Sequence, residues 1–209
     1  MTHSRLVIIG DGLVARQALS IAAFIAPAPE VRAEVLTPEQ IWRTDLEFLN
    51  SDTPTCTEVF AAIGLEALNY ARFDLWAKVR LAGFRCARLV HPAATIDPTA
   101  HVGGNCLVGA HVSIGPDVRI GEGCILNSGA RIEAGTVIGS FCWIGANATL
   151  GGDTKVGAHT VFGAGVHIAS GMTVGAHCEV TLPGSYDQPL AEGTFASRWF
   201  ASPPRIYRG

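Results

Sequence analysis

The chain has 209 residues, of which 48% are hydrophobic and 16% charged, with a formal net charge of −3. This slightly acidic balance gives no support for nucleic-acid binding. No apolar run approaches the ~20 residues that cross a bilayer, so we expect no membrane span. The apolar segment Leu6–Ile9 passes straight into Gly10 without the layout of a signal peptide. The cysteines show no disulfide or metal-binding pattern, so we expect a reduced, cytoplasmic setting.

Residues 1–88 predict a small Rossmann-like α/β domain. A buried strand at residues 5–9 is followed by a helix around 15–23 and by further strands near 31–36 and 58–63. An apolar stripe over residues 68–82 predicts a second helix that ends at Gly83. The domain is too short for a complete dinucleotide fold.

The turn after the first strand has the sequence G-x-G-x-x-A and begins with Gly10, Asp11 and Gly12. Backbone N–H groups at such a strand-to-helix turn can meet a phosphate group. The same pattern also fits a tight structural turn, so both interpretations stay open.

From Val90 to Val180, sixteen aliphatic or aromatic residues stand six positions apart without an insertion. Neither a helix nor an ordinary strand gives this period, which predicts a parallel β-helix over residues 89–185. Three hexads make one triangular coil, so residues 18 apart should stack. Residues 186–209 would form a tail that caps the open end of the prism or contacts a ligand.

Two further positions of the hexad carry structural expectations. Glycine often follows the large residue, which we attribute to a turn that needs a permissive backbone. A small residue stands four positions after the large one and should fill the corner. Four cysteines occupy this position, and we interpret them as packing residues: Cys106, Cys124, Cys142 and Cys178.

Several segments besides the hexads resemble one protein family. They are Ile9-Gly10-Asp11-Gly12, Ala62-Ile63-Gly64, the run from His91 to Ala100, Ile125-Leu126-Asn127, and the ending from Phe200 to Ile206. Together they resemble the hexapeptide-repeat nucleotide-sugar N-acetyltransferases of the sialic-acid and bacillosamine pathways. The resemblance implies a left-handed β-helix that forms a homotrimer, with acetyl-CoA along the groove between neighbouring prisms. It also implies an N-terminal domain that holds the nucleotide sugar, and a histidine that deprotonates the sugar amine.

The resemblance assigns expected roles to individual residues. Gly10, Asp11 and Gly12 would bind the nucleotide sugar, with Trp143 as a further substrate-binding candidate. The residues expected to line the coenzyme A site are Gly145, Gly151, Gly152 and Gly163, together with Arg205 of the tail.

The chain departs from the family in its catalytic stretch, which in the family reads I-E-H-x-x-x-I-G-x-x-x-H-I. Glu133 is kept, but Ala134 and Trp143 replace the two histidines. Alanine cannot accept a proton, so general-base catalysis worth roughly 10²–10⁴-fold is lost at that position. An amine can still attack a thioester through proximity alone, whereas a hydroxyl cannot, so the substitution argues against O-acylation.

Other side chains are candidates for the roles of the two absent histidines. Glu133 is a candidate base, and Asn127 could hold an acceptor hydroxyl or the acetyl oxygen. Trp143 could fill a vanished acyl pocket or form the floor of a pocket for another group. His159 and His177 should stack as solvated corner residues, and no closely spaced histidine pair predicts a metal site.

One column of polar residues should run up a single face of the prism, toward either a groove or water: Ser113, Arg131, Thr149 and His167. We expect an acyl-CoA-dependent N-acyltransferase, most simply acetyl, that acts on a nucleotide-linked amino sugar in bacterial surface-glycan biosynthesis. Two alternatives stay open. One is a catalytically degenerate binding or scaffold protein, and the other is an acyltransferase on a different amine with another base.

Overall fold

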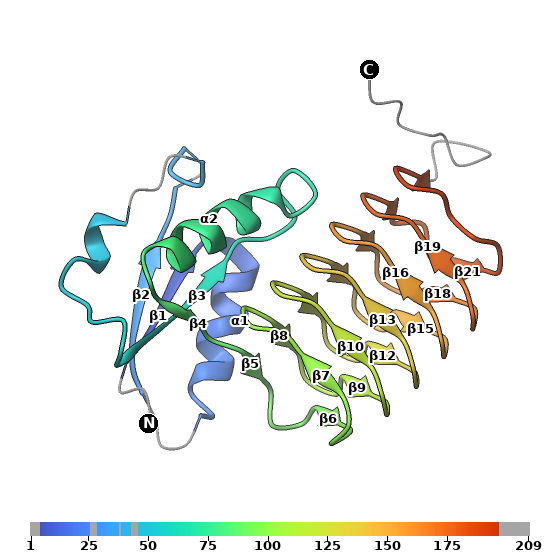
Figure 1. The fold of residues 1–209 in the computed structure, drawn as a ribbon, viewed down its shortest axis with the longest axis horizontal. Coiled ribbons are helices and arrows are strands. Elements are labelled where there is room, and N and C mark those ends of the chain that lie inside the picture. The colour runs from blue at the N-terminus through green and yellow to red at the C-terminus, as the bar shows by residue number, and fades with distance from the viewer. Residues whose placement is uncertain (1–4, 26–28, 38, 43–45, 197–209) are drawn as a thin grey trace.

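The N-terminal part of the computed structural model is a small parallel sheet with a helix on each face (Figure 1). The structure describes residues 5–25, 29–37, 39–42 and 46–196. The strands lie in the order β2-β1-β3-β4 and span β1 (Arg5–Gly10), β2 (Glu30–Val35), β3 (Thr57–Ala62) and β4 (Arg85–Cys86). The helices are α1 (Gly12–Ala22), α2 (Tyr70–Leu81) and a short 3₁₀ helix (Glu47–Leu49). The elements predicted from the sequence are present, with boundaries shifted by up to three residues.

Alternation along the central strand explains the two apolar layers of this domain. Leu6 and Ile8 pack with α1, whereas Val7 and Ile9 pack with α2, because successive side chains of a strand point to opposite faces. Both faces of the sheet are therefore covered, which is typical of parallel sheets.

The remainder of the described chain winds into a three-sided prism of short parallel strands (Figure 1). The first face contains β5 (Leu89–Val90), β8 (Leu107–Val108), β11 (Ile125–Leu126), β14 (Trp143–Ile144), β17 (Val161–Phe162), β20 (Glu179–Val180) and β22 (Phe195–Ala196). The second face contains β6 (Thr95–Ile96), β9 (Ser113–Ile114), β12 (Arg131–Ile132), β15 (Thr149–Leu150), β18 (Val166–Ile168) and β21 (Gly184–Tyr186). The third face contains β7 (His101–Val102), β10 (Arg119–Ile120), β13 (Val137–Ile138), β16 (Lys155–Val156) and β19 (Thr173–Val174).

The register confirms the predicted coil of 18 residues. Leu126 pairs with Val108 on the preceding coil and with Ile144 on the next. These residues of the hexad series are fully buried inside the prism. The four corner cysteines are also buried and unpaired, which confirms that they act as packing residues.

Strand pairing continues past residue 185, where the sequence predicts the start of a tail. β21 pairs with β18, β22 pairs with β20, and Leu190 forms a bridge with Val174. Leu190 and Ala196 still pack against the prism core although the hexad spacing has ended. Residues 186–196 therefore extend the prism, and the rest of the predicted tail lies outside the described residues.

The glycines that follow the large residues are required by close stacking of the coils. A Cβ atom at Gly151 would lie 2.6 Å from the backbone nitrogen of Ser170 on the next coil. The left-handed backbone falls two residues later in the turn, as at Phe141 (φ 58°) and Asn147 (φ 56°). The expectation that a permissive φ explains these glycines is wrong, because the constraint is the distance between stacked backbones.

The N-terminal domain docks on one edge of the prism, which we call the third corner because it follows the third face. Residues 18 apart form a column along this edge: Asn105, Gly123, Phe141, His159 and His177. The Asn105 amide exchanges hydrogen bonds of 2.8 and 3.1 Å with the backbone of Ala61. These bonds fasten the carboxyl end of β3 to the prism.

Arg72 of α2 is fully buried at the same contact. Its guanidinium donates to the carbonyl of Gly123 on the prism at 2.8 Å. It also donates to the carbonyls of Ile63 and Gly64 after β3, each at 2.7 Å. Burial lowers the pKa of Arg72 to about 10, which leaves the side chain charged at neutral pH.

The two corner histidines are covered by α2. The Tyr70 ring stacks on His159 with centroids 4.1 Å apart, and its hydroxyl lies 2.9 Å from Nε2 of His177. His159 Nδ1 lies 3.2 Å from the Leu68 carbonyl, and His177 Nδ1 lies 3.2 Å from a carboxylate oxygen of Glu192. The prediction that these histidines stack is confirmed, but the prediction that both are solvated is wrong for His159, which is 9% exposed.

We predict that Arg72→Ala strongly destabilises the protein. The substitution leaves three backbone carbonyls without their donor, which should cost about 3 kcal/mol or more of unfolding free energy. Urea denaturation measures the change. Arg80→Ala, on the exposed side of the same helix, is the control and should stay within about 0.5 kcal/mol of wild type. Equal midpoints for the two variants would contradict the assigned role of Arg72.

We also predict that the free energy of unfolding falls at acidic pH because His159 becomes protonated. Desolvation lowers its pKa in the folded protein below the ordinary value, so the unfolded chain binds the proton more readily. The stability that depends on the neutral ring is complete above about pH 6.5 and is lost as the pH falls through the lowered value. The urea midpoint of wild type should therefore fall more steeply between pH 7.5 and 5.5 than that of His159→Phe. Tyr70 and His177 stack on this ring, and the charges of His177 and Arg72 also lower its pKa. These groups are unchanged in both proteins, so parallel slopes would contradict the prediction.

Candidate functional site

An open groove of about 630 Å³ runs along the second face of the prism and the corner that follows it, which we call the second corner. The second face contributes Arg131, Thr149 and His167. The second corner contributes Glu133, Ala134, Gly151, Gly152 and Ser170.

The coil register explains why three polar side chains line this groove. Arg131, Thr149 and His167 are register partners on β12, β15 and β18. The next residue of each strand is buried in the prism core, so the alternation of the strand turns these three outward. The sequence left open whether this column faces a groove or water. The structure places Arg131, Thr149 and His167 in the groove, whereas Ser113, the fourth member of the predicted column, is not part of the groove lining.

Four of the residues singled out from the sequence come together here. Glu133 and Ala134 belong to one coil, and Gly151 and Gly152 belong to the next. Glu133 Oε1 lies 3.4 Å from Nη2 of Arg131, with 48% and 66% of the two side chains exposed. Such an exposed ion pair is weak, and it leaves both charges accessible from the groove. Ser170, which the hexad pattern did not single out, completes the rim.

Asn127 lies at a different corner, the first corner, which follows the first face. Its amide nitrogen donates to the Ile144 carbonyl at 3.0 Å, and the residue is 7% exposed. Gly145 and Gly163 follow first-face strands as well, so they also belong to the first corner. The glycines expected to line one coenzyme A site therefore occupy two edges of the prism, and Asn127 does not join Glu133 in the groove.

Trp143 lies on the outer side of the first face, beneath the N-terminal domain. It packs against an apolar cluster that includes Val14 of α1 together with Leu107 and Ile125 of the prism. Position 143 is thus part of the contact between the two domains. Residues of the groove are not part of this cluster.

The turn Gly10–Gly12 joins the carboxyl end of β1 to the start of α1. A Cβ atom at Gly10 would overlap the carbonyl of Ala62 at the end of β3, and Gly12 has a left-handed φ of 55°. Both glycines are therefore required by the local backbone. This geometry accounts for the motif as a tight turn, and a role in binding stays a prediction. Arg205 lies outside the described residues.

A smaller cavity of about 150 Å³ separates α1 from the first corner. Its lining includes Gln17 and Ser20 of the helix and His91 and Ser128 of the prism. Oε1 of Gln17 is buried without a hydrogen-bond partner. Of these four residues only His91 belongs to a segment singled out from the sequence for its resemblance to the family. The others were missed because the helix and the prism meet only when the two domains dock.

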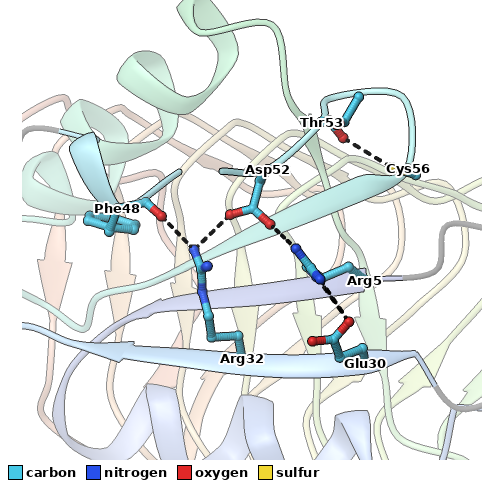
Figure 2. Close-up of polar contacts among 7 residues, drawn as sticks. All are labelled: Arg5, Glu30, Arg32, Phe48, Asp52, Thr53 and Cys56. Carbon is cyan, nitrogen blue, oxygen red and sulfur yellow. Dashed lines mark hydrogen bonds and ion pairs between the residues drawn. The ribbon is translucent and has the colours of Figure 1, made fainter. Parts of the chain in front are cut away.

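The densest charged cluster of the described N-terminal domain lies at the opposite end of its sheet (Figure 2). The carboxylate of Asp52 is fully buried and accepts hydrogen bonds of 2.8 Å from both Arg5 and Arg32. Arg5 also pairs with Glu30, and Arg32 donates to the Phe48 carbonyl. These contacts fasten the loop around the 3₁₀ helix to β1 and β2, which is a structural role.

None of the helices among the described residues is both long and apolar enough to cross a membrane. Within the same residues, no group of three His, Cys, Asp or Glu side chains is arranged to hold a metal ion.

Solved structures match the chain over almost its whole described architecture. The acetyltransferase domain of PglB from Neisseria gonorrhoeae gives a TM-score of 0.79 at 23% identity, covering 92% of this chain and 95% of that one. A histidine-to-alanine mutant of GDP-perosamine N-acetyltransferase from Caulobacter crescentus, in complex with CoA and GDP-perosamine, gives 0.80 at 27% identity. The match covers 95% of this chain and 96% of that one.

The chain has the fold of the hexapeptide-repeat nucleotide-sugar acetyltransferases. The predicted combination of a small α/β domain and a left-handed β-helix is thereby confirmed. The family model described as the GMPPB C-terminal domain matches residues 85–184 of this acetyltransferase-like chain, which is slightly less than half of it. No curated protein matches the sequence.

We predict different outcomes for alanine at two adjacent glycines of the groove. Gly151→Ala should destabilise the fold by roughly 1–3 kcal/mol, because the added methyl group meets the backbone of Ser170. Gly152→Ala should destabilise the fold much less than Gly151→Ala, because its Cβ would lie 3.3 Å from the nearest atom, the carbonyl oxygen of Ala134, and a small shift relieves this contact. Thermal melts compare the stabilities. If both variants melt together with wild type, coil stacking does not impose the glycine at position 151.

Proposed function

We propose that the protein is an acetyl-CoA-dependent N-acetyltransferase that acts on a nucleotide-linked amino sugar. The observation that carries the proposal is the groove in which Glu133, Ala134, Gly151 and Gly152 meet. These residues are among those that the resemblance places near the acyl donor and the reacting amine. Structures of the acetyltransferase domain of PglB with acetyl coenzyme A, and of the Caulobacter enzyme with CoA and GDP-perosamine, support the same donor and substrate class.

The proposal gives the two domains separate tasks. The carboxyl edge of the small sheet, at the Gly10–Gly12 turn, would hold the nucleotide. The prism would hold the acyl donor in its groove. A homotrimer, in which neighbouring prisms complete each groove, and a cytoplasmic location belong to this proposal.

The absence of a histidine at position 134 is compatible with binding. The Caulobacter enzyme was crystallised with CoA and GDP-perosamine in a histidine-to-alanine and in a histidine-to-asparagine form. Loss of one histidine therefore does not prevent that protein from holding both ligands. By analogy, Ala134 here would remove a proton acceptor without removing either binding site.

An amine acceptor suits the groove better than a hydroxyl acceptor. A neutral amine is nucleophilic without deprotonation and loses its proton only after the bond to the acyl carbon has formed. Positioning against the thioester can then supply a large part of the rate. The alternative is a homologue that binds the nucleotide sugar without turnover, and Ala134 with Trp143 is the observation that favours it.

We predict that calorimetric titration of the protein detects micromolar binding of acetyl-CoA and of one member of a panel of GDP-, UDP- and dTDP-linked amino sugars. The same pair should release free CoA thiol, measured with a thiol reagent, and give an N-acetylated sugar by mass spectrometry. Binding of a nucleotide sugar without binding of acetyl-CoA would favour the non-catalytic alternative. Binding of neither ligand would contradict both functions.

A further inference from the structure

His167 is the one imidazole in the groove among the described residues. Of the seven histidines in the sequence, six lie in the described part of the chain. His159 and His177 belong to the stack with Tyr70, and Nδ1 of His91 accepts the backbone N–H of Ala93. His101 lies on the third face and His111 at the first corner, away from the groove lining.

The groove contains two side chains that can accept a proton, Glu133 and His167. Glu133 is already paired with Arg131 on its own coil. His167 is exposed, and the structure shows no hydrogen bond or ion pair to it within the described residues. An imidazole is also the side chain whose protonation changes near neutral pH, as a general base for an amine requires.

The register places His167 at a defined height along the groove. It pairs with Thr149, which pairs with Arg131, so it lies two coils from the coil of Ala134 and one from that of Gly151 and Gly152. With coils about 4.8 Å apart, these separations are roughly 10 Å and 5 Å along the prism. An imidazole extending from β18 can therefore reach the space above the two glycines more readily than the space beside Ala134.

We infer that His167 is the proton acceptor of the acyl transfer, with the reacting amine held above Gly151 and Gly152 rather than beside Ala134. This inference rests on the proposed function. The amine nitrogen attacks the thioester carbon, the new C–N bond forms, and the C–S bond breaks to release CoA thiolate. His167 takes the proton that the amine loses and passes it to the thiolate sulfur, directly or through one water molecule. The reaction thus balances without a base at position 134.

The test compares His167→Gln with the control His101→Gln, an exposed histidine on the third face. We measure kcat and KM against pH, with acetyl-CoA and the amino sugar that wild type acetylates. His167→Gln should lower kcat roughly 10²–10⁴-fold with KM for acetyl-CoA within about threefold, and should remove the acid limb of the pH profile. Glu133 and Arg131, the other charged groups in the groove, are unchanged in both variants. His101→Gln should match wild type, and both variants should keep its melting temperature.

A second variant distinguishes a base at position 167 from a reaction that needs a base at position 134. Ala134→His should give no gain in wild type and no rescue of His167→Gln, because the reacting amine lies one coil away. Activity of His167→Gln within threefold of wild type, or rescue by Ala134→His, overturns the inference and leaves the proposed function intact. A wild type that transfers no acetyl group to any amine of the panel overturns both.

Discussion

The hydrogen-bonded stacking of coils 18 residues apart is the constraint on which the rest of the structure depends. Each coil contributes only two or three residues to each face, so no strand is stable alone. The prism is stabilised by hydrogen bonds between neighbouring coils. Some of these bonds come from corner side chains that contact the backbone of the next coil. Thr136 donates to the Gly151 carbonyl at 3.1 Å, and Cys124 contacts the Gly139 carbonyl at 3.2 Å. The stacking favours a repeat of fixed length, because an extra residue kept within a coil would shift the register of the contacts that follow it.

Because the coils stack, residues 18 positions apart in the sequence form columns on the surface of the prism. Two of these columns have different roles. The third corner carries Asn105, Phe141 and His159, and it receives the N-terminal domain. The second face carries Arg131, Thr149 and His167, and it lines the groove. A rigid prism therefore presents a docking edge and a candidate reaction surface at fixed positions relative to each other.

A buried cation determines how the domains meet. Among the described residues Arg72 has no carboxylate partner, and its guanidinium donates to the carbonyls of Ile63, Gly64 and Gly123 and to Oδ1 of Asn69. Desolvation of such a group is costly, so the contact favours one geometry over alternatives that would leave the guanidinium without acceptors. In that geometry Trp143 fills space beneath α1, which gives this tryptophan a packing role. The alanine at position 134 has no packing explanation in the structure.

The sequence by itself determined the fold and the members of one candidate site. The period of six determined which residues enter the prism, and the coil of 18 residues stacks Gly151 and Gly152 on Glu133 and Ala134 at one corner. The hexad and the coil repeat along the chain at a constant spacing, so the sequence alone reveals them. Only the tertiary structure decided that His167 faces the groove, that Tyr70 covers His159, and that Asn127 and Gly145 lie on another edge. The domain contact joins residues about 90 positions apart, as between Leu68 and His159, through single side chains without a period. Such contacts depend on the orientation of two finished domains, which no spacing in the sequence encodes.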